Sequence, residues 1–157
     1  MENNLTKVNT HENKKKGKVL VIEDNPDWID YLKKHLEKAG FFVLTASNLT
    51  MAKQMITSDR FHFITIDMQL VKDTERNKFE GWDILAIVKY LNLEDTTTPC
   101  MVVTAHPEDY IELSPVKQLK SMFFMSKKAF DKRQFVETIE RVIATKNIQF
   151  KDDQRGD

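Results

Sequence analysis

Short apolar runs alternate along the chain with amphipathic segments, and four of these runs end at a residue that can take part in chemistry. The runs cover residues 18–22, 61–66, 100–103 and 122–126, and they lead into Glu23-Asp24, Asp67, Thr104 and Lys127. Near-continuous apolar runs of this length are typical of parallel strands that are buried on both faces. Open α/β sheets bind ligands at the edge formed by the carboxyl ends of their strands, so we expect these residues to converge there.

Helix signals fill the segments between the predicted strands. Asn25 and Pro26 favour a helix start, and an apolar stripe follows until Gly40 ends the helix. Asn48 is expected to cap a second helix, and Asp131, followed three residues later by Gln, resembles a capping box at the start of the last one. Residues 81–91 and 107–120 also predict helices, and residues 41–46 predict a further strand.

The alternation of strands and helices predicts an α/β protein with a doubly wound, five-stranded parallel sheet that carries helices on both faces. The polar N-terminal residues show no period, and the last residues are polar as well. We therefore predict a disordered tail over residues 1–16, one domain over residues 17–147 and a polar tail over residues 148–157.

Composition narrows the class of protein. Hydrophobic residues make up 41% of the chain, and 24 basic side chains balance 24 acidic ones, which argues against a nucleic-acid-binding role. The single cysteine, Cys100, cannot form an internal disulfide and indicates a reduced compartment. No apolar run approaches the length of a membrane span. We expect a cytoplasmic protein with neither a nucleic acid nor a membrane as partner.

The predicted strand ends suggest a metal-assisted site. Glu23, Asp24 and Asp67 would form a cluster of three carboxylates, and because like charges repel, such a cluster favours a bound cation. Oxygen ligands of this kind suit Mg²⁺. The backbone carbonyl of Gln69, two residues past Asp67, is a candidate for a further ligand.

Phosphoryl chemistry fits the same set of residues. A carboxylate at Asp67 beside Mg²⁺ can attack a phosphoryl group and form an aspartyl phosphate. The hydroxyl of Thr104 and the ammonium of Lys127 are suited to bind the phosphoryl oxygens. Each residue also has a plainer interpretation on its own: Thr favours strands in general, and a lysine after a strand is often solvated.

Five short motifs occur in a recognisable order: VLVIEDN at 19–25, IDMQL at 66–70, Gly81, VTA at 103–105 and FMSK at 124–127. Together they resemble the receiver domain of two-component response regulators, and the resemblance covers residues 17–145. It implies a flavodoxin-like receiver fold with strand order 2-1-3-4-5. It also implies residue roles: Mg²⁺ ligands at Glu23, Asp24, Asp67 and the Gln69 carbonyl, the phosphoacceptor Asp67, phosphate contacts from Thr104 and Lys127, and a switch at Thr104 with the aromatic Phe124.

The resemblance further implies partners. The phosphoryl donor would be a histidine kinase or a histidine phosphotransfer protein, and the output would be contact with an unidentified downstream protein. No effector domain follows residue 147 in this sequence, so we expect a stand-alone receiver. Such a domain is not an enzyme, although self-phosphorylation and slow autodephosphorylation are compatible with it. Pairing of two copies through the last helices is left open.

The sequence also departs from the receiver pattern, which leaves alternatives. Val71 stands four residues past Asp67, where receivers usually carry Pro, and Lys128 follows Lys127 where Pro is usual. A second hypothesis is therefore a receiver-like interaction module that works without phosphorylation. A third, a haloacid-dehalogenase-type phosphatase, is disfavoured because Gln69 occupies the position of its acidic residue and has no titratable proton.

Overall fold

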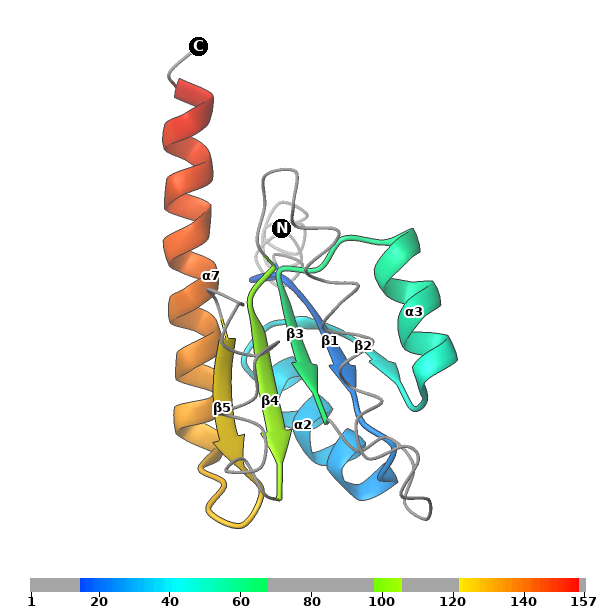
Figure 1. Cartoon of the computed structure of the whole chain (residues 1–157). Coiled ribbons are helices and arrows are strands. Elements are labelled where there is room, and N and C mark those ends of the chain that lie inside the picture. Colours follow the sequence, from blue (N-terminus) through cyan, green and yellow to red (C-terminus); the bar gives the residue numbers. More distant parts are fainter. Residues whose placement is uncertain (1–14, 68–97, 106–121, 156–157) are drawn as a thin grey trace, which may run out of the picture.

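A parallel five-stranded sheet forms the centre of the molecule (Figure 1). The computed structural model describes residues 15–67, 98–105 and 122–155, except for the side chains of residues 122 and 146–155. Its strands are β1 (Lys18–Ile22), β2 (Phe42–Ala46), β3 (Phe63–Ile66), β4 (Cys100–Thr104) and β5 (Met122–Ser126). They are hydrogen-bonded in the order β2-β1-β3-β4-β5, which confirms the predicted fold class and strand order.

The helices of the described segments begin where short polar side chains can cap them. They are α2 (Pro26–Lys38), α3 (Leu49–Ser58) and α7 (Lys132–Arg155). Asn25 Oδ1 accepts hydrogen bonds from two first-turn amides of α2, at 2.9 and 3.3 Å. Asn48 and Asp131 cap α3 and α7 in the same way. The predicted helices over residues 81–91 and 107–120 lie outside the described residues.

A positive backbone φ ends the first helix. Gly40 has φ of +101°, a conformation that favours glycine because it has no Cβ. The chain then turns, and the backbone N–H of Phe41 donates to Leu36 O at 3.1 Å. Phe41 is fully buried, and β2 begins at the next residue.

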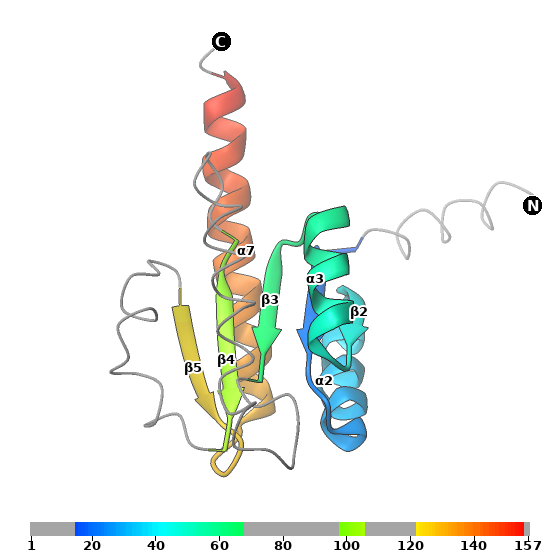
Figure 2. The same ribbon diagram turned by 45° about the vertical axis from the view of Figure 1, so that its right-hand side comes forward.

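Two hydrophobic clusters hold the helices on opposite faces of the sheet (Figure 2). The cluster beneath α2 and α7 includes the fully buried Phe63, Leu36 and Phe135. The cluster beneath α3 includes Ile64 and Ala52. Successive strand residues point to opposite faces, so each strand contributes to both clusters. Burial of a large apolar side chain stabilises a fold by about 1.5–3 kcal/mol, which makes these clusters the main support of the sheet.

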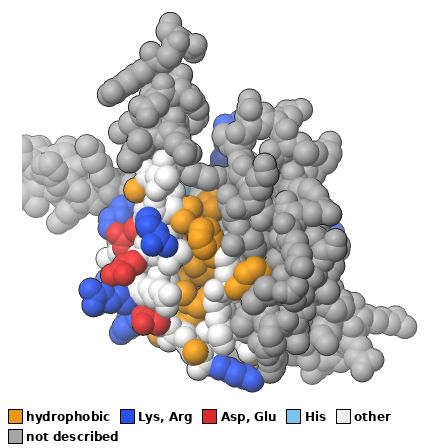
Figure 3. All heavy atoms as spheres, turned by 60° about the vertical axis from the view of Figure 1, so that its left-hand side comes forward, with side chains coloured by type: hydrophobic (Ala, Val, Ile, Leu, Met, Phe, Trp, Pro, Cys, Tyr) orange, Lys and Arg blue, Asp and Glu red, His pale blue; other side chains and the backbone are white. Residues whose placement is uncertain are grey.

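The last helix continues well past the end of the sheet (Figure 1). It reaches Arg155, and the predicted domain boundary at residue 147 falls within it. Lys, Arg, Asp and Glu side chains gather on its outer face, beside a strip of hydrophobic side chains (Figure 3). Glu140 of this helix pairs with Lys16 at 3.0 Å and ties the helix to the start of the chain's described part. Among the described residues, no helix has the apolar length that a membrane crossing would need.

Candidate functional site

Three carboxylates meet at the carboxyl edge of the sheet. The register of the parallel strands places Ile22 beside Ile66, so the residues that follow, Glu23 and Asp67, emerge side by side. Backbone hydrogen bonds continue the ladder past the strand ends, from Asp67 N to Ile22 O at 2.9 Å. One carboxylate oxygen each from Glu23, Asp24 and Asp67 lie within 4.8 Å of one another. The predicted acidic cluster is therefore present in the fold.

The ammonium of Lys127 joins two of these carboxylates. Its Nζ lies 2.8 Å from Glu23 Oε2 and 3.2 Å from Asp67 Oδ2. The Lys127 side chain is only 14% exposed, so this contact is shielded from solvent. The backbone N–H of Lys127 donates to Thr104 O at 2.8 Å. This bond holds the backbone of Lys127 beside the end of β4.

Burial and a neighbouring carboxylate both disfavour the ionised form of Glu23. Its surface is 1% exposed. Burial, and then the neighbouring charge of Asp67, raise the pKa of Glu23 from 4.5 to about 7. Lys127 and the backbone N–H of Asn25, which donates to Glu23 Oε1 at 3.1 Å, act in the opposite direction but do not cancel the rise. Within the part of the chain that the structure describes, one ammonium contacts this group of three carboxylates.

The acidic cluster matches the requirements of a hard divalent cation. Glu23, Asp24 and Asp67 offer oxygen donors only, and two of the three residues are buried. Magnesium is commonly held by one or a few carboxylates while it keeps several waters. The chemistry of the donor set and the raised pKa of Glu23 both fit Mg²⁺.

The remaining predicted residues lie at different distances from the cluster. Thr104 ends β4, is 4% exposed, and stands in register with Ser126 of β5. Phe124 is half-buried and packs against the hydrophobic cluster beneath α3. Gln69 lies outside the described residues, as does Val71. The structure thus brings Glu23, Asp24, Asp67 and Lys127 together, with Thr104 at the adjoining strand end.

Lys128 stands where receivers usually carry proline, and a side-chain hydrogen bond stabilises the segment at this position. The backbone N–H of Lys128 donates to Ser126 Oγ at 3.1 Å. The Lys128 side chain is exposed, whereas that of Lys127 turns into the acidic cluster. The hydroxyl of Ser126 therefore stabilises the backbone turn at Lys127 and Lys128, whose side chains point in different directions.

Two aromatic residues next to the site have no role in the predicted phosphoryl chemistry. Trp28 belongs to the apolar stripe of the first helix, and Lys127 Nζ lies 5.1 Å from the centre of its ring. Phe130 packs edge-on against Trp28, with ring centres 5.3 Å apart. The signal available in the sequence was proximity, since Trp28 stands four residues past Asp24, in the first turn of the helix that follows.

Comparisons with known proteins identify the family of this chain. The sequence matches the family model of the response regulator receiver domain over residues 19–140. The chain therefore belongs to the receiver domain family of two-component response regulators. In that family the acidic pocket binds Mg²⁺, and the domains interact with histidine kinases or phosphotransfer proteins and with downstream targets.

Solved structures share the fold at low sequence identity. The chemotaxis response regulator CheY4 of Vibrio cholerae is 23% identical with a TM-score of 0.63, and the match covers 80% of this chain and 97% of that one. The receiver domain of the Francisella response regulator 1452 is 20% identical with a TM-score of 0.66, covering 83% and 98%. NtrX from Brucella abortus is 19% identical with a TM-score of 0.70, covering 88% of this chain but only 29% of NtrX.

Proposed function

We propose that this chain is a response regulator receiver that accepts a phosphoryl group on Asp67 in a Mg²⁺-dependent reaction. The observation that carries the proposal is the position of the Asp67 carboxylate, which shares the Lys127 ammonium with Glu23 inside a cluster of three acids. The donor would be the phosphohistidine of a kinase or a phosphotransfer protein. The output would be a change in protein–protein contact.

Asp67 is suited to the role of nucleophile. One of its carboxylate oxygens attacks phosphorus while the bond from phosphorus to the histidine nitrogen breaks, and the electron pair leaves with the imidazole. Asp67 is 7% exposed, so little water competes at this position. Its acyl phosphate product would form next to the Lys127 ammonium, which is 3.2 Å from Oδ2 before the reaction.

The neighbouring residues would together stabilise the negative charge of the phosphoryl group. Glu23, Asp24, Asp67 and the Gln69 carbonyl would hold Mg²⁺, which supplies Lewis-acid stabilisation of the transferring phosphoryl oxygens. Lys127 would exchange a carboxylate contact for a phosphoryl oxygen. The hydroxyl of Thr104, at the end of β4, would donate to another phosphoryl oxygen.

The signal would reach the protein surface through side-chain movements in the last two strands, β4 and β5. A Thr104 hydroxyl drawn toward the phosphoryl group leaves space at the end of β4, and Phe124 in the adjacent β5 is the aromatic residue placed to fill it. Phe124 is half-buried and packs against the hydrophobic cluster beneath α3, next to β4. A downstream protein would recognise this changed surface.

Phosphorylation can be tested directly with a small donor. The wild-type chain incubated with phosphoramidate and Mg²⁺ should gain the mass of one phosphoryl group, and a chelator should prevent the gain. Asp67→Asn should gain nothing. Asp59→Asn is the matched control, because Asp59 is exposed, pairs with Lys18 at 2.7 Å and lies outside the acidic cluster.

The outcome also separates the alternative functions. A wild-type chain that takes up no phosphate would contradict the proposal and favour the phosphorylation-independent interaction module. An adduct that persists in Asp67→Asn would also contradict the proposal, because the phosphoryl group would then be on another residue. The interaction module predicts normal partner binding by Asp67→Ala. Multiple turnovers of a phosphomonoester would instead point to a phosphatase, which lacks its usual acidic partner here because Gln69 stands in that position.

A further inference from the structure

The Lys127 ammonium has a third neighbour that the phosphoacceptor chemistry alone does not explain. Besides the carboxylates of Glu23 and Asp67, the ring of Trp28 lies 5.1 Å from Lys127 Nζ. A cation within about 6 Å of an aromatic ring centre is attracted by the negative face of the ring, and tryptophan gives the strongest such contact. The attraction increases when the cation is shielded from water, as Lys127 is.

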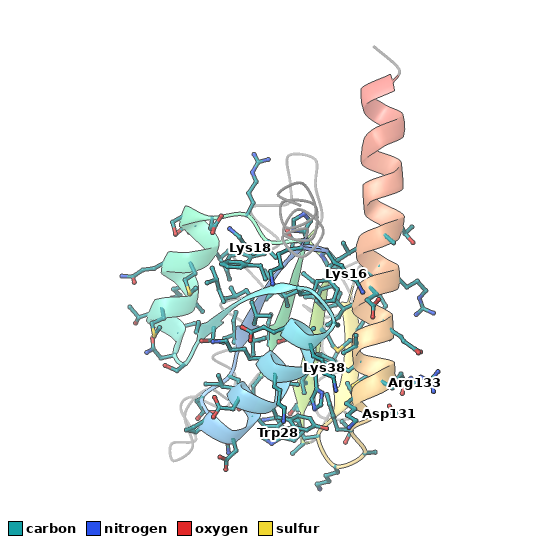
Figure 4. All side chains as sticks on the ribbon, turned by 180° about the vertical axis from the view of Figure 1, so that it is seen from behind. Lys16, Lys18, Trp28, Lys38, Asp131 and Arg133 are labelled. Atoms are coloured by element: carbon teal, nitrogen blue, oxygen red, sulfur yellow. The ribbon has the colours of Figure 1, made fainter. Side chains whose placement is uncertain are left out.

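The Trp28 ring is itself held in place by other aromatic residues. Tyr31 on the next turn of α2 meets it edge-on at 5.6 Å, with the ring planes at 83°. Phe130 meets it at 5.3 Å and 79°, and also packs against Phe135 of α7 at 5.2 Å. Figure 4 shows Trp28 at the N-terminal end of α2, on the side toward Asp131 and the start of α7. This aromatic cluster gives the ring a defined position.

The same contacts restrain the segment that carries Lys127. Phe130 lies three residues after Lys127, between β5 and α7, and it contacts both Trp28 and Tyr31 on α2. The segment is therefore held from the side of α2 as well as by the Lys128 N–H bond to Ser126 Oγ. A proline after Lys127 would restrain the segment through its ring, and in this chain side-chain packing restrains it instead.

We propose that Trp28 is a positioning residue for Lys127, holding the ammonium over the Asp67–Glu23 pair through its ring face. A lysine side chain is long and loses considerable rotamer entropy when it is fixed in one place. The ring offsets part of that cost, because an ammonium that swings away from the carboxylates also loses the aromatic contact. The effect on phosphoryl transfer rests on the proposed function, whereas the contact between Trp28 and Lys127 does not.

A double-mutant cycle tests the contact independently of phosphorylation. The four proteins are the wild type, Trp28→Leu, Lys127→Gln and the double variant, each unfolded in urea without Mg²⁺. We expect the two changes to be non-additive, with a coupling of roughly fivefold in the unfolding equilibrium constant. Additive effects would overturn the proposal. Trp28→Phe keeps a weaker aromatic face and should retain part of the coupling.

The same variants test positioning during the reaction. With saturating phosphoramidate and Mg²⁺, Trp28→Leu should slow phosphorylation of Asp67 roughly fivefold, and Trp28→Phe should restore part of the rate. In the Lys127→Gln background, Trp28→Leu should cause no further loss. An equal loss in both backgrounds, or no rescue by Phe, would assign Trp28 a purely structural role and overturn the proposal.

A matched aromatic deletion controls for general loosening of the fold. Phe42→Leu removes an exposed ring that also lies near a lysine, with Lys18 Nζ at 5.7 Å, but on the edge strand β2 outside the acidic cluster. It should leave the phosphorylation rate unchanged. If the wild type takes up no phosphate, the proposed function fails, and the urea cycle alone then decides whether Trp28 positions Lys127.

Discussion

Lys127 Nζ lies 2.8 Å from Glu23 Oε2, although β3 and β4 separate the two strands that these residues follow. Neighbouring strands are about 4.8 Å apart, so the ends of β5 and β1 stand roughly 14 Å from each other. Two long side chains close that distance across the carboxyl edge of the sheet. The pair thereby links the first and last strands of the candidate site in one shielded ion pair.

The raised pKa of Glu23 predicts a pH-dependent stability in the absence of Mg²⁺. Its pKa is about 7 in the folded protein against an ordinary 4.5, so between these values the folded state holds more protons than the unfolded state. The free energy of unfolding should therefore fall as the pH rises from 4.5 to 7, by at most about 3 kcal/mol. Urea unfolding of wild type and Glu23→Gln across this range should show the slope in the wild type only. Parallel curves would contradict it.

The crowding of carboxylates predicts that loss of Asp67 stabilises the metal-free protein. At pH 8, Asp67→Asn removes the neighbouring charge that raises the Glu23 pKa, while it keeps the size of the side chain. We expect the Tm to increase by roughly 2–4 °C, equivalent to about 1 kcal/mol. Differential scanning calorimetry with a chelator measures it. An unchanged or lower Tm in this variant, with Asp59→Asn as control, would argue against mutual repulsion in the cluster.

Magnesium should stabilise the folded chain and change its fluorescence. A cation at Glu23, Asp24 and Asp67 reduces the net negative charge, and at tenfold excess over its Kd the gain is about 1.4 kcal/mol. Because Trp28 contacts Lys127, which shares these carboxylates, its emission should respond to the same titration. A Trp82→Phe background isolates the signal. Asp24→Asn should shift saturation to higher Mg²⁺, and a response that never saturates would contradict specific binding.

The buried hydroxyl of Thr65 predicts a stabilising substitution. Thr65 lies in β3, is 1% exposed, and its Oγ1 has no hydrogen-bond partner within the described residues. A buried polar group without a partner costs about 1–3 kcal/mol. Thr65→Val keeps the shape and removes the hydroxyl, so the free energy of unfolding should rise by about 1 kcal/mol. Thr65→Ser, which keeps the hydroxyl and loses the methyl, should lower it; a less stable Val variant would indicate a hidden partner.

Local patterns in the sequence were sufficient for the fold class, whereas the strand order was predicted from the resemblance to receiver domains. The apolar runs, the caps at Asn25, Asn48 and Asp131, and the stop at Gly40 all depend on neighbouring residues and the periods of strand and helix, so they can be predicted without tertiary information. Parallel connectivity then requires the carboxyl ends of the strands to share one edge, which is why the convergence of Glu23, Asp24, Asp67 and Lys127 was also predictable.

Tertiary packing decided how those groups interact. The shared ammonium, the raised pKa of Glu23 and the contact between Trp28 and Lys127 depend on burial and on distances between side chains from β1, α2, β3 and β5. These distances follow from strand register and helix packing. Both depend on many non-local contacts, so local sequence patterns do not predict them. The order of residues is therefore enough to predict which chemical groups reach the edge of the sheet, whereas their partners and their charge depend on the folded chain.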